Sequence, residues 1–174
     1  RRSGVRVLLA DDGEWTSADL LISNATIQWF DQPLAVMARV HAALPSHAIL
    51  AFSTFGPETF RELRLSFTAA AASLGLPAMP RTLKLPDEAT WQAALATAPH
   101  LPIHCESALW PGTWPSLSDF LHQVRAAGAN LPGGPPLTPT LWRAVQAHYH
   151  QHWAVAGGIQ ASYQPIWIYR EPVR

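Results

Sequence analysis

Residues 18–55, "ADLLISNATIQWFDQPLAVMARVHAALPSHAILAFSTF", hold two short apolar runs separated by a segment of helix length. The runs 18–24 and 48–55 have the length and composition of buried strands. Between them, Asp31 and Pro33 predict the cap and the first turn of a helix. Two buried strands joined through a helix are typical of a parallel sheet covered by helices, so this stretch predicts an α/β fold.

The same alternation continues on both sides of this stretch. Further buried strands are expected in "VRVLLADD", "IHCESALW" and "IQASYQPIWIY", which begin at residues 5, 103 and 159. Helices are expected to begin near residues 57, 116 and 138. Between 76 and 100, several prolines around a short Ala-rich helix are typical of an insertion or lid. We therefore divide the chain into a first core part at 1–75, a lid at 76–100 and the remainder of the core at 101–174.

The composition limits the classes of partner. Twelve basic and twelve acidic residues cancel, so no net field points to a nucleic acid or to a membrane surface. No apolar run reaches the roughly 18 residues that are needed to span a bilayer. The single cysteine, Cys105, excludes an internal disulfide and is consistent with a reducing cytoplasm, which is where we expect the protein.

Polar and aromatic side chains follow the predicted strands at their carboxyl ends, where open parallel sheets bind their ligands. These side chains are Asp11, Asp12, Asn24, Gln28, Trp29, Ser53, Thr54 and Phe55. Carboxylates can accept hydrogen bonds from an adenine amino group or a ribose, and aromatic rings supply flat apolar walls. For Asp11 or Trp29 alone, a turn cap or simple core packing explains the residue equally well. Together, they indicate a ligand site.

Several familiar motifs are absent. None of the ten glycines forms a G-x-G-x-x-G or Walker pattern, so a nucleotide-like ligand would lack its usual loop. His148 and His152 are four residues apart on one helix, but no carboxylate completes a ligand set, so a solvated helix is favoured and no metal is expected. Ser53 has no G-x-S-x-G context, which argues against a hydrolase.

Three stretches resemble one enzyme family. They are residues 19–67, the phrase "SLSDFLHQVRAAGAN" at 116–130 and the phrase "GGIQASYQPIWIY" at 157–169. Their sequence resembles the malonyl-[acyl-carrier-protein] O-methyltransferases of biotin synthesis, which are S-adenosylmethionine-dependent methyltransferases. "SNATIQW" is shared with other small-acid methyltransferases, whereas "AFSTFGPETFRELR" is the more specific phrase.

The resemblance implies a seven-stranded, Rossmann-like sheet in the order 3-2-1-4-5-7-6, with the last-added strand antiparallel and a small helical lid. The five predicted strands of this chain then correspond to strands 3 to 7. Strands 1 and 2, with the glycine-rich loop that holds the cofactor, have no counterpart. The expected fold class is therefore an α/β partial methyltransferase sheet, and the chain is expected to be the C-terminal portion of an enzyme and inactive alone. A self-sufficient 174-residue version is the alternative.

The resemblance also implies roles for particular residues. Near the cofactor, S-adenosylmethionine, it puts Asp11, Asp12 and Asn24. Near the acceptor it puts Gln28, Trp29, Phe55, Arg81 and Lys84. The last two are candidates to meet the substrate carboxylate or an acidic carrier protein. No residue is assigned a catalytic role.

The implied reaction is methyl transfer to the free carboxylate of malonyl-acyl-carrier protein. Two alternatives stay open. One is a methyltransferase for a free small carboxylic acid, such as the trans-aconitate type. The other is a truncated, non-catalytic remnant that binds a partner through an exposed sheet edge.

Overall fold

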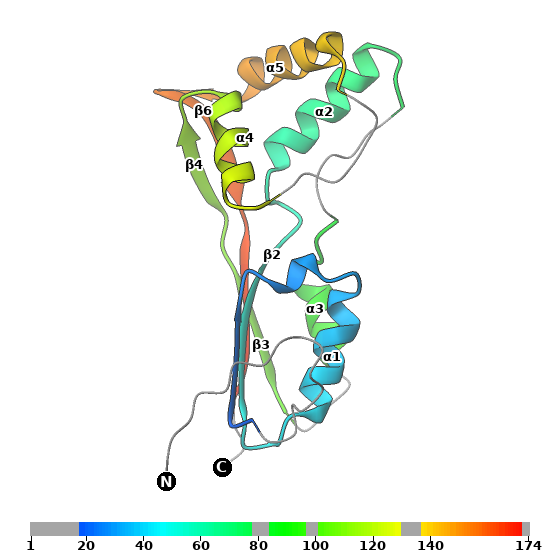
Figure 1. Ribbon diagram of the computed structural model, residues 1–174, viewed down its shortest axis with the longest axis vertical. Helices are drawn as coiled ribbons and strands as arrows, with labels where there is room; N and C mark the ends of the chain where they lie inside the picture. Colours follow the sequence, from blue (N-terminus) through cyan, green and yellow to red (C-terminus); the bar gives the residue numbers. More distant parts are fainter. Residues whose placement is uncertain (1–17, 78–83, 97–100, 130–136, 172–174) are drawn as a thin grey trace.

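A computed structural model of the chain describes residues 18–77, 84–96, 101–129 and 137–171. These residues form two layers joined by long strands (Figure 1). The strands are β1 Leu20–Asn24, β2 Ile49–Phe55, β3 Ile103–Ser107, β4 Trp110–Trp114, β5 Ala154–Val155, β6 Gly158–Tyr163 and β7 Pro165–Arg170. The helices are the 3-10 helix η2 Ile27–Trp29 and the α-helices α1 Pro33–Ala43, α2 Arg61–Ser73, α3 Glu88–Leu95, α4 Leu117–Ala126 and α5 Pro139–Trp153.

The lower layer is built on a four-stranded sheet with the order β1-β2-β7-β3. β1 and β2 are parallel, and β7 is antiparallel to both of its neighbours. This is the order 4-5-7-6 that the resemblance implies, with the expected antiparallel strand. The segment expected as strand 3 lies outside the described residues, and the absence of strands 1 and 2 stays a prediction.

A continuous antiparallel ribbon connects the two layers. β3 and β4 form one arm, and β6 and β7 form the other. The register is constant along the whole ribbon, from the pair Ile103 and Arg170 to the pair Trp114 and Ile159. In its upper half, β6 lies between β4 and β5 in a three-stranded sheet. The ribbon therefore fixes the position of one layer relative to the other (Figure 1).

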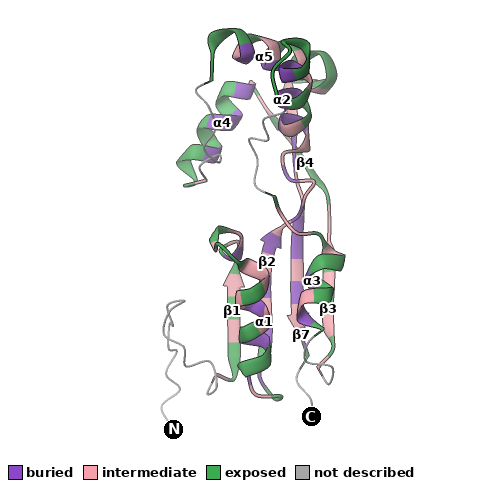
Figure 2. Cartoon of the chain, turned by 90° about the vertical axis from the view of Figure 1, so that its right-hand side faces the viewer, coloured by how far each residue is buried: buried purple, intermediate pink, exposed green. Residues whose placement is uncertain are grey.

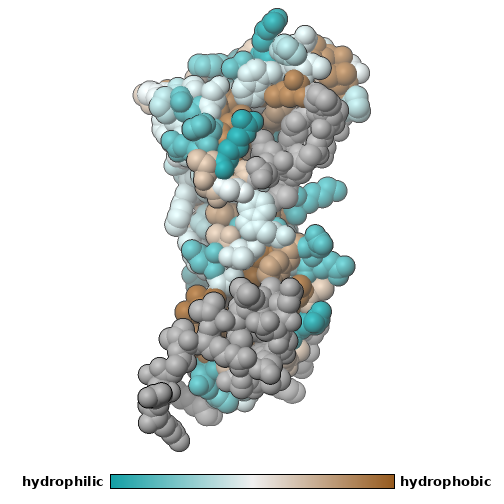
Figure 3. Space-filling model, in the orientation of Figure 1, coloured by the Kyte–Doolittle hydropathy of each residue, from teal (hydrophilic) through white to brown (hydrophobic). Residues whose placement is uncertain are grey.

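Among the described elements, helices α1 and α3 cover one face of the lower sheet (Figure 1). Buried residues gather in the central strands β2 and β7, whereas β1 and β3 are more exposed (Figure 2). On the open face, Leu20, Ile22 and Ile49 are 52%, 68% and 42% exposed. Apolar residues also reach the surface at the left edge of this layer in Figure 3. Within the described part of the chain, the lower sheet thus carries apolar side chains on both faces, and helices cover one of them.

The upper layer packs α2, α4 and α5 around the three-stranded sheet. The face of α4 that the sequence periodicity predicts is buried, and it comprises Leu117, Phe120, Leu121 and Val124. Two predicted helix starts are also confirmed, because Ser116 accepts a hydrogen bond from Asp119 N and Thr138 accepts one from Leu141 N. α1 begins at Pro33 as predicted, but its N-cap is Gln32 in place of Asp31.

The structure describes 76–77 and 84–96 of the segment that we expected as a lid, and its role as a lid stays a prediction. Within that segment, α3 packs on the lower sheet, where Trp91 and Leu95 are fully buried and Phe52 lies edge-on to Trp91 with ring centroids 5.3 Å apart. Trp91 and Leu95 are four residues apart and therefore lie on one face of α3, so packing this face on the sheet buries both side chains. The upper layer is formed by α2, α4 and α5.

Candidate active site

The carboxyl ends of β1 and β2 lie side by side, because Asn24 pairs with Ser53. Ser53 Oγ donates a hydrogen bond to Asn24 Oδ1 over 2.5 Å, and Ala25 N donates to both Ser53 O and Ser53 Oγ at 3.1 Å. Ala25 has a φ of 48°, which turns the chain out of β1. The Asn24 amide is thereby oriented through its oxygen, and its Nδ2 makes no hydrogen bond within the described part of the chain.

Gln28 connects the η2 turn to the end of β2. Its Nε2 donates to Ala25 O over 2.6 Å, and its Oε1 accepts from Thr54 Oγ1 over 3.3 Å. Both ends of the side chain are therefore bound by the protein itself, which explains the close spacing of polar groups after β1. The adjacent Trp29 is 47% exposed, so its indole is accessible. The expected roles of Gln28 and Trp29 toward the acceptor stay predictions.

An aromatic cluster occupies the junction of the two layers, and we call it the waist cluster. It comprises Phe55, Phe60, Trp114, Phe120 and Tyr163. The ring centroid of Tyr163 is 5.9 Å from that of Phe55, 4.8 Å from Phe60 and 6.1 Å from Trp114. Since Phe55 is the last residue of β2, the predicted acceptor wall is continuous with the floor of the upper layer. Of the residues in this cluster, the sequence analysis named Phe55 as a candidate site residue but missed Tyr163.

Gln164 fixes the turn that follows Phe55. Its backbone oxygen accepts from Gly56 N over 2.7 Å, and its Oε1 accepts from Glu58 N over 2.9 Å. A Cβ at position 56 would lie 2.4 Å from Gln164 Oε1, so glycine permits this close approach. Gln164 was also missed, because its partners lie more than one hundred residues away in the sequence.

The other predicted site residues divide into two groups. Lys84 is described and exposed, just before α3. Asp11, Asp12 and Arg81 lie outside the described residues. The structure therefore brings together Asn24, Gln28 and, through β2, Phe55. It does not test the expected carboxylates of the first strand or the expected arginine.

A buried carboxylate ties α2 to β6 above the waist cluster. Glu62 is fully buried and accepts hydrogen bonds from Ser162 N over 3.0 Å, Ser162 Oγ over 2.5 Å and Gln160 Nε2 over 3.2 Å. Tyr149 OH donates to Gln160 O over 2.7 Å. Burial, and secondarily the charge of Glu62, raises the pKa of Tyr149. This network stabilises the upper layer. Sequence reasoning missed it because glutamate in a helix is usually exposed.

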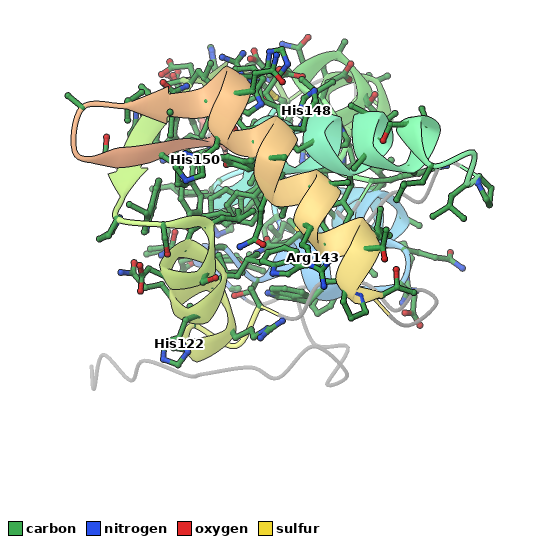
Figure 4. All side chains as sticks on the ribbon, turned by 90° about the horizontal axis from the view of Figure 1, so that it is seen from above. His122, Arg143, His148 and His150 are labelled. Atoms are coloured by element: carbon green, nitrogen blue, oxygen red, sulfur yellow. The ribbon has the colours of Figure 1, made fainter. Side chains whose placement is uncertain are left out.

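The histidines of α5 form a pair but not a ligand set. The rings of His148 and His152 are 4.3 Å apart, and His148 Nδ1 lies 3.0 Å from Ser66 Oγ. Burial, and then the neighbouring His152, lowers the pKa of His148. His148 and His150 leave α5 on different sides (Figure 4). Among the described residues, no group of three or more His, Cys, Asp or Glu is arranged to hold a metal ion.

Within the same described ranges, every helix is too short or too polar to cross a membrane.

Curated relatives match the chain over most of its length. The malonyl-[acyl-carrier protein] O-methyltransferase of Brevibacillus brevis is 33% identical over 168 residues, which is 91% of this chain and 60% of the relative. The enzymes of the same name from Halalkalibacterium halodurans and a Paenibacillus species are 32% and 29% identical, and the alignments cover 86% and 96% of this chain. The chain is thus similar in sequence to the malonyl-[acyl-carrier protein] O-methyltransferases. The resemblance stated from its motifs is confirmed.

The length of the match is also informative. This chain covers 55%, 60% and 64% of the three malonyl-[acyl-carrier protein] O-methyltransferases. The chain therefore spans little more than half the length of the relatives that it matches.

Comparisons with family models and solved structures add less. No protein-family model matches the chain. Among solved structures, the YcgJ protein of Bacillus subtilis is 12% identical, with a TM-score of 0.49 over 91% of this chain and 66% of that chain. A plantazolicin methyltransferase solved with SAH is 12% identical, with a TM-score of 0.33 over 87% of this chain and 53% of that chain. TM-scores below 0.5 do not establish a shared fold.

Proposed function

We propose that this chain contributes cofactor-binding and acceptor-binding residues to an S-adenosylmethionine-dependent methyltransferase that methylates the free carboxylate of malonyl-acyl-carrier protein. Two observations support this proposal. The curated relatives carry that activity in their names. In addition, Asn24 is held beside Ser53 at the ends of two parallel strands, next to aromatic residues, which is where ligands of such sheets bind. The second observation carries the proposal for this chain.

The residues at this edge fit a cofactor with a polar, aromatic nucleoside. Asn24 Nδ2 has no partner within the described residues and can donate a hydrogen bond to the cofactor. The exposed indole of Trp29 offers a flat surface on the acceptor side. S-adenosylmethionine supplies a methyl group on a sulfonium, which departs as a neutral sulfide. Asn24, Asp11 and Asp12 would hold the cofactor. Trp29 and Phe55 would line the binding site of the acceptor. Gln28 would hold the turn after β1 against the end of β2 through its hydrogen bonds.

The reaction needs little acid or base chemistry from these side chains. A malonyl carboxylate is already ionised at neutral pH, so its oxygen forms the new bond to carbon without losing a proton. The protein must align that oxygen with the methyl carbon and exclude water. Alignment of this kind contributes up to roughly 7–11 kcal/mol in favourable systems. The waist cluster, with its apolar rings, is suited to excluding water, and Arg81 or Lys84 would attract the acidic acceptor.

The test combines binding with turnover. The full-length product of the gene that encodes these residues is titrated calorimetrically with S-adenosylhomocysteine, and the 174-residue chain is titrated in parallel. Methyl transfer is then measured with malonyl-acyl-carrier protein and with free malonate. We expect cofactor binding, with transfer to the carrier-bound acid. An Asn24→Ala variant should weaken binding about tenfold, whereas Gln151→Ala, which removes an exposed amide on α5, should not.

Each alternative gives a distinct result. Transfer to free malonate in preference to the carrier-bound acid would favour a small-acid methyltransferase. No binding of S-adenosylhomocysteine by the full-length product would overturn the proposal and favour a non-catalytic remnant. For such a remnant, β1, an edge strand among the described strands, would be a surface for pairing, beside the exposed Leu20 and Ile22.

A further inference from the structure

The three tyrosines of the chain differ in what their hydroxyls contact. Tyr149 OH donates to Gln160 O over 2.7 Å, inside the upper layer. Tyr169 OH donates to Glu106 Oε1 over 3.3 Å, on the open face of the lower sheet. Tyr163 OH makes no hydrogen bond to any described residue, although its ring is half-buried. A hydroxyl in such surroundings usually has a partner.

The ring of Tyr163 is held from both layers. Phe55 contacts it from the end of β2, while Phe60 and Trp114 contact it from the upper layer. The angles between ring planes are 51°, 78° and 42°, so the ring is enclosed by edges and tilted faces on several sides. Such packing orients the hydroxyl at little further entropic cost, since few rotamers remain accessible to an enclosed ring.

Tyr163 belongs to the same end of the sheet as Asn24. Ser53, whose hydroxyl binds Asn24, lies two residues before Phe55 on the same face of β2. Phe55 in turn touches the Tyr163 ring. Two other polar side chains at this end of the sheet, Gln28 and Ser53, already form hydrogen bonds within the protein. The described donors that remain are the Asn24 amide and the Tyr163 hydroxyl.

We propose that the Tyr163 hydroxyl donates a hydrogen bond to the carboxylate of the methyl acceptor and holds that carboxylate for transfer, an inference that rests on the proposed function. An anion that enters an aromatic-lined site loses water and needs donors in exchange. A phenol donates one such bond, and bonds to charged acceptors are stronger than neutral ones. No proton moves: Tyr163 keeps its hydrogen while the carboxylate oxygen gains the methyl group.

The ionisation state of Tyr163 is consistent with this role. Burial raises the pKa of Tyr163 above its ordinary value of 10. The side chain therefore remains a neutral donor at physiological pH and does not repel an approaching anion. Its aromatic neighbours contribute no competing acceptor oxygen.

The test uses Tyr163→Phe, which keeps the ring and removes the hydroxyl, with Tyr169→Phe as the matched control. Both are made in the full-length gene product. We expect kcat/KM for malonyl-acyl-carrier protein to fall about 10- to 100-fold in Tyr163→Phe, since one hydrogen bond to a charged group is lost. Binding of S-adenosylhomocysteine should stay within about twofold, and Tyr169→Phe should match the unaltered protein in both measurements.

A second measurement separates acceptor recognition from a structural effect. Calorimetry in the presence of S-adenosylhomocysteine compares malonyl-pantetheine with its methyl ester. The unaltered protein should prefer the acid, and Tyr163→Phe should reduce that preference about tenfold. Equal weakening of both ligands, or unchanged preference and turnover, would overturn the inference. If the unaltered protein binds no S-adenosylhomocysteine, the proposed function fails first, and the inference fails with it.

Discussion

Among the residues that the structure describes, each layer buries one charged side chain, and the two charges have opposite signs. In the lower layer Arg170 is 1% exposed and donates to the backbone oxygens of Ala48, Pro45 and His41 over 2.6–3.3 Å. In the upper layer Glu62 is fully buried and accepts from Ser162 and Gln160. Neutral hydrogen-bonding groups surround Arg170, whereas Glu62 also meets a cation, because Arg61 Nε lies 3.5 Å from Glu62 Oε1.

The positions of the two charges relative to the candidate site differ. Arg170 pairs with Leu50 near the start of β2 and joins the end of α1 to that end of the sheet. The candidate site is at the other end of β2. Glu62 lies near the start of α2, two residues after Phe60 of the waist cluster. We infer that Arg170 stabilises the lower layer without reaching the site, whereas Glu62 supports the upper wall of the site itself.

The largest effect is expected for Arg170→Met. The substitution keeps an unbranched apolar chain but leaves three backbone oxygens without their donor, which should lower the free energy of unfolding by about 3–5 kcal/mol. Urea unfolding measures the loss. The exposed Arg39→Met on α1 is the matched control and should change stability by less than about 0.5 kcal/mol. Similar losses for the two variants would show that the buried contacts of Arg170 contribute little.

Glu62→Gln should have a smaller effect, concentrated in the other layer. The amide NH2 would replace a carboxylate oxygen that faces donors of Ser162 or Gln160, so we expect a loss of about 2–3 kcal/mol. Hydrogen exchange should accelerate in α2 and β6 and stay unchanged in β2. The control is Glu58→Gln, whose carboxylate is partly exposed beside Arg61 and Arg64. Faster exchange in both layers would contradict the separation between them.

Acid should lower the free energy of unfolding through His41, by less than the Glu62→Gln substitution does. His41 is fully buried, and burial, followed by the charge of Arg170, lowers its pKa below 6.5. The folded state then binds fewer protons than the unfolded state below pH 6.5, so stability falls as the pH falls from 6.5 toward the folded pKa. For one proton the slope is at most about 1.4 kcal/mol per pH unit.

The measurement for His41 is urea unfolding as a function of pH. His41→Gln should flatten the profile between pH 5 and 7, whereas the exposed His150→Gln should leave it unchanged. An unchanged slope in His41→Gln would assign the pH dependence to another group.

Much of this fold follows from local patterns. The strands at 18–24 and 48–55 and the buried face of α4 are specified by composition and periodicity within a few residues. The order of the strands comes from the resemblance, since periodicity does not specify neighbours. β4 was missed because Pro111 and Gly112 are poor strand formers, and it is its pairing with β6 that makes it a strand. The packing of α3 depends on tertiary contacts in the same way.

The candidate site was predictable only where its residues directly follow a strand in the sequence. Asn24 and Phe55 follow apolar runs directly, so their positions at strand ends can be read from the sequence. Tyr163 and Gln164 lie at the centre of the ribbon, and only folding brings them next to β2. Arg170 and Glu62 were unexpected because their type predicts exposure, and their partners are distant backbone and side-chain groups.

The smallest effect is expected at Ala25, and its sign is opposite to the others. Ala25 and Phe60 both have a left-handed backbone, with φ of 48° and 57°, and each lies at one side of the site. Phe60 is held by ring contacts, whereas Ala25 is held by its N–H bonds to Ser53. Ala25→Gly keeps those bonds and removes a Cβ strain of about 1 kcal/mol, part of which is offset by the greater freedom of the unfolded chain.

Ala25→Gly should therefore raise the free energy of unfolding by about 0.5 kcal/mol. Ala38→Gly in the middle of α1 is the matched control, because the same change at a helical φ should lower it by about 1 kcal/mol. If both variants lost stability equally, the turn after β1 would not be strained. The orientation of Asn24 would then depend only on its hydrogen bond from Ser53 Oγ. In that case Ser53→Ala would show whether this bond, and not the shape of the turn, supports cofactor binding.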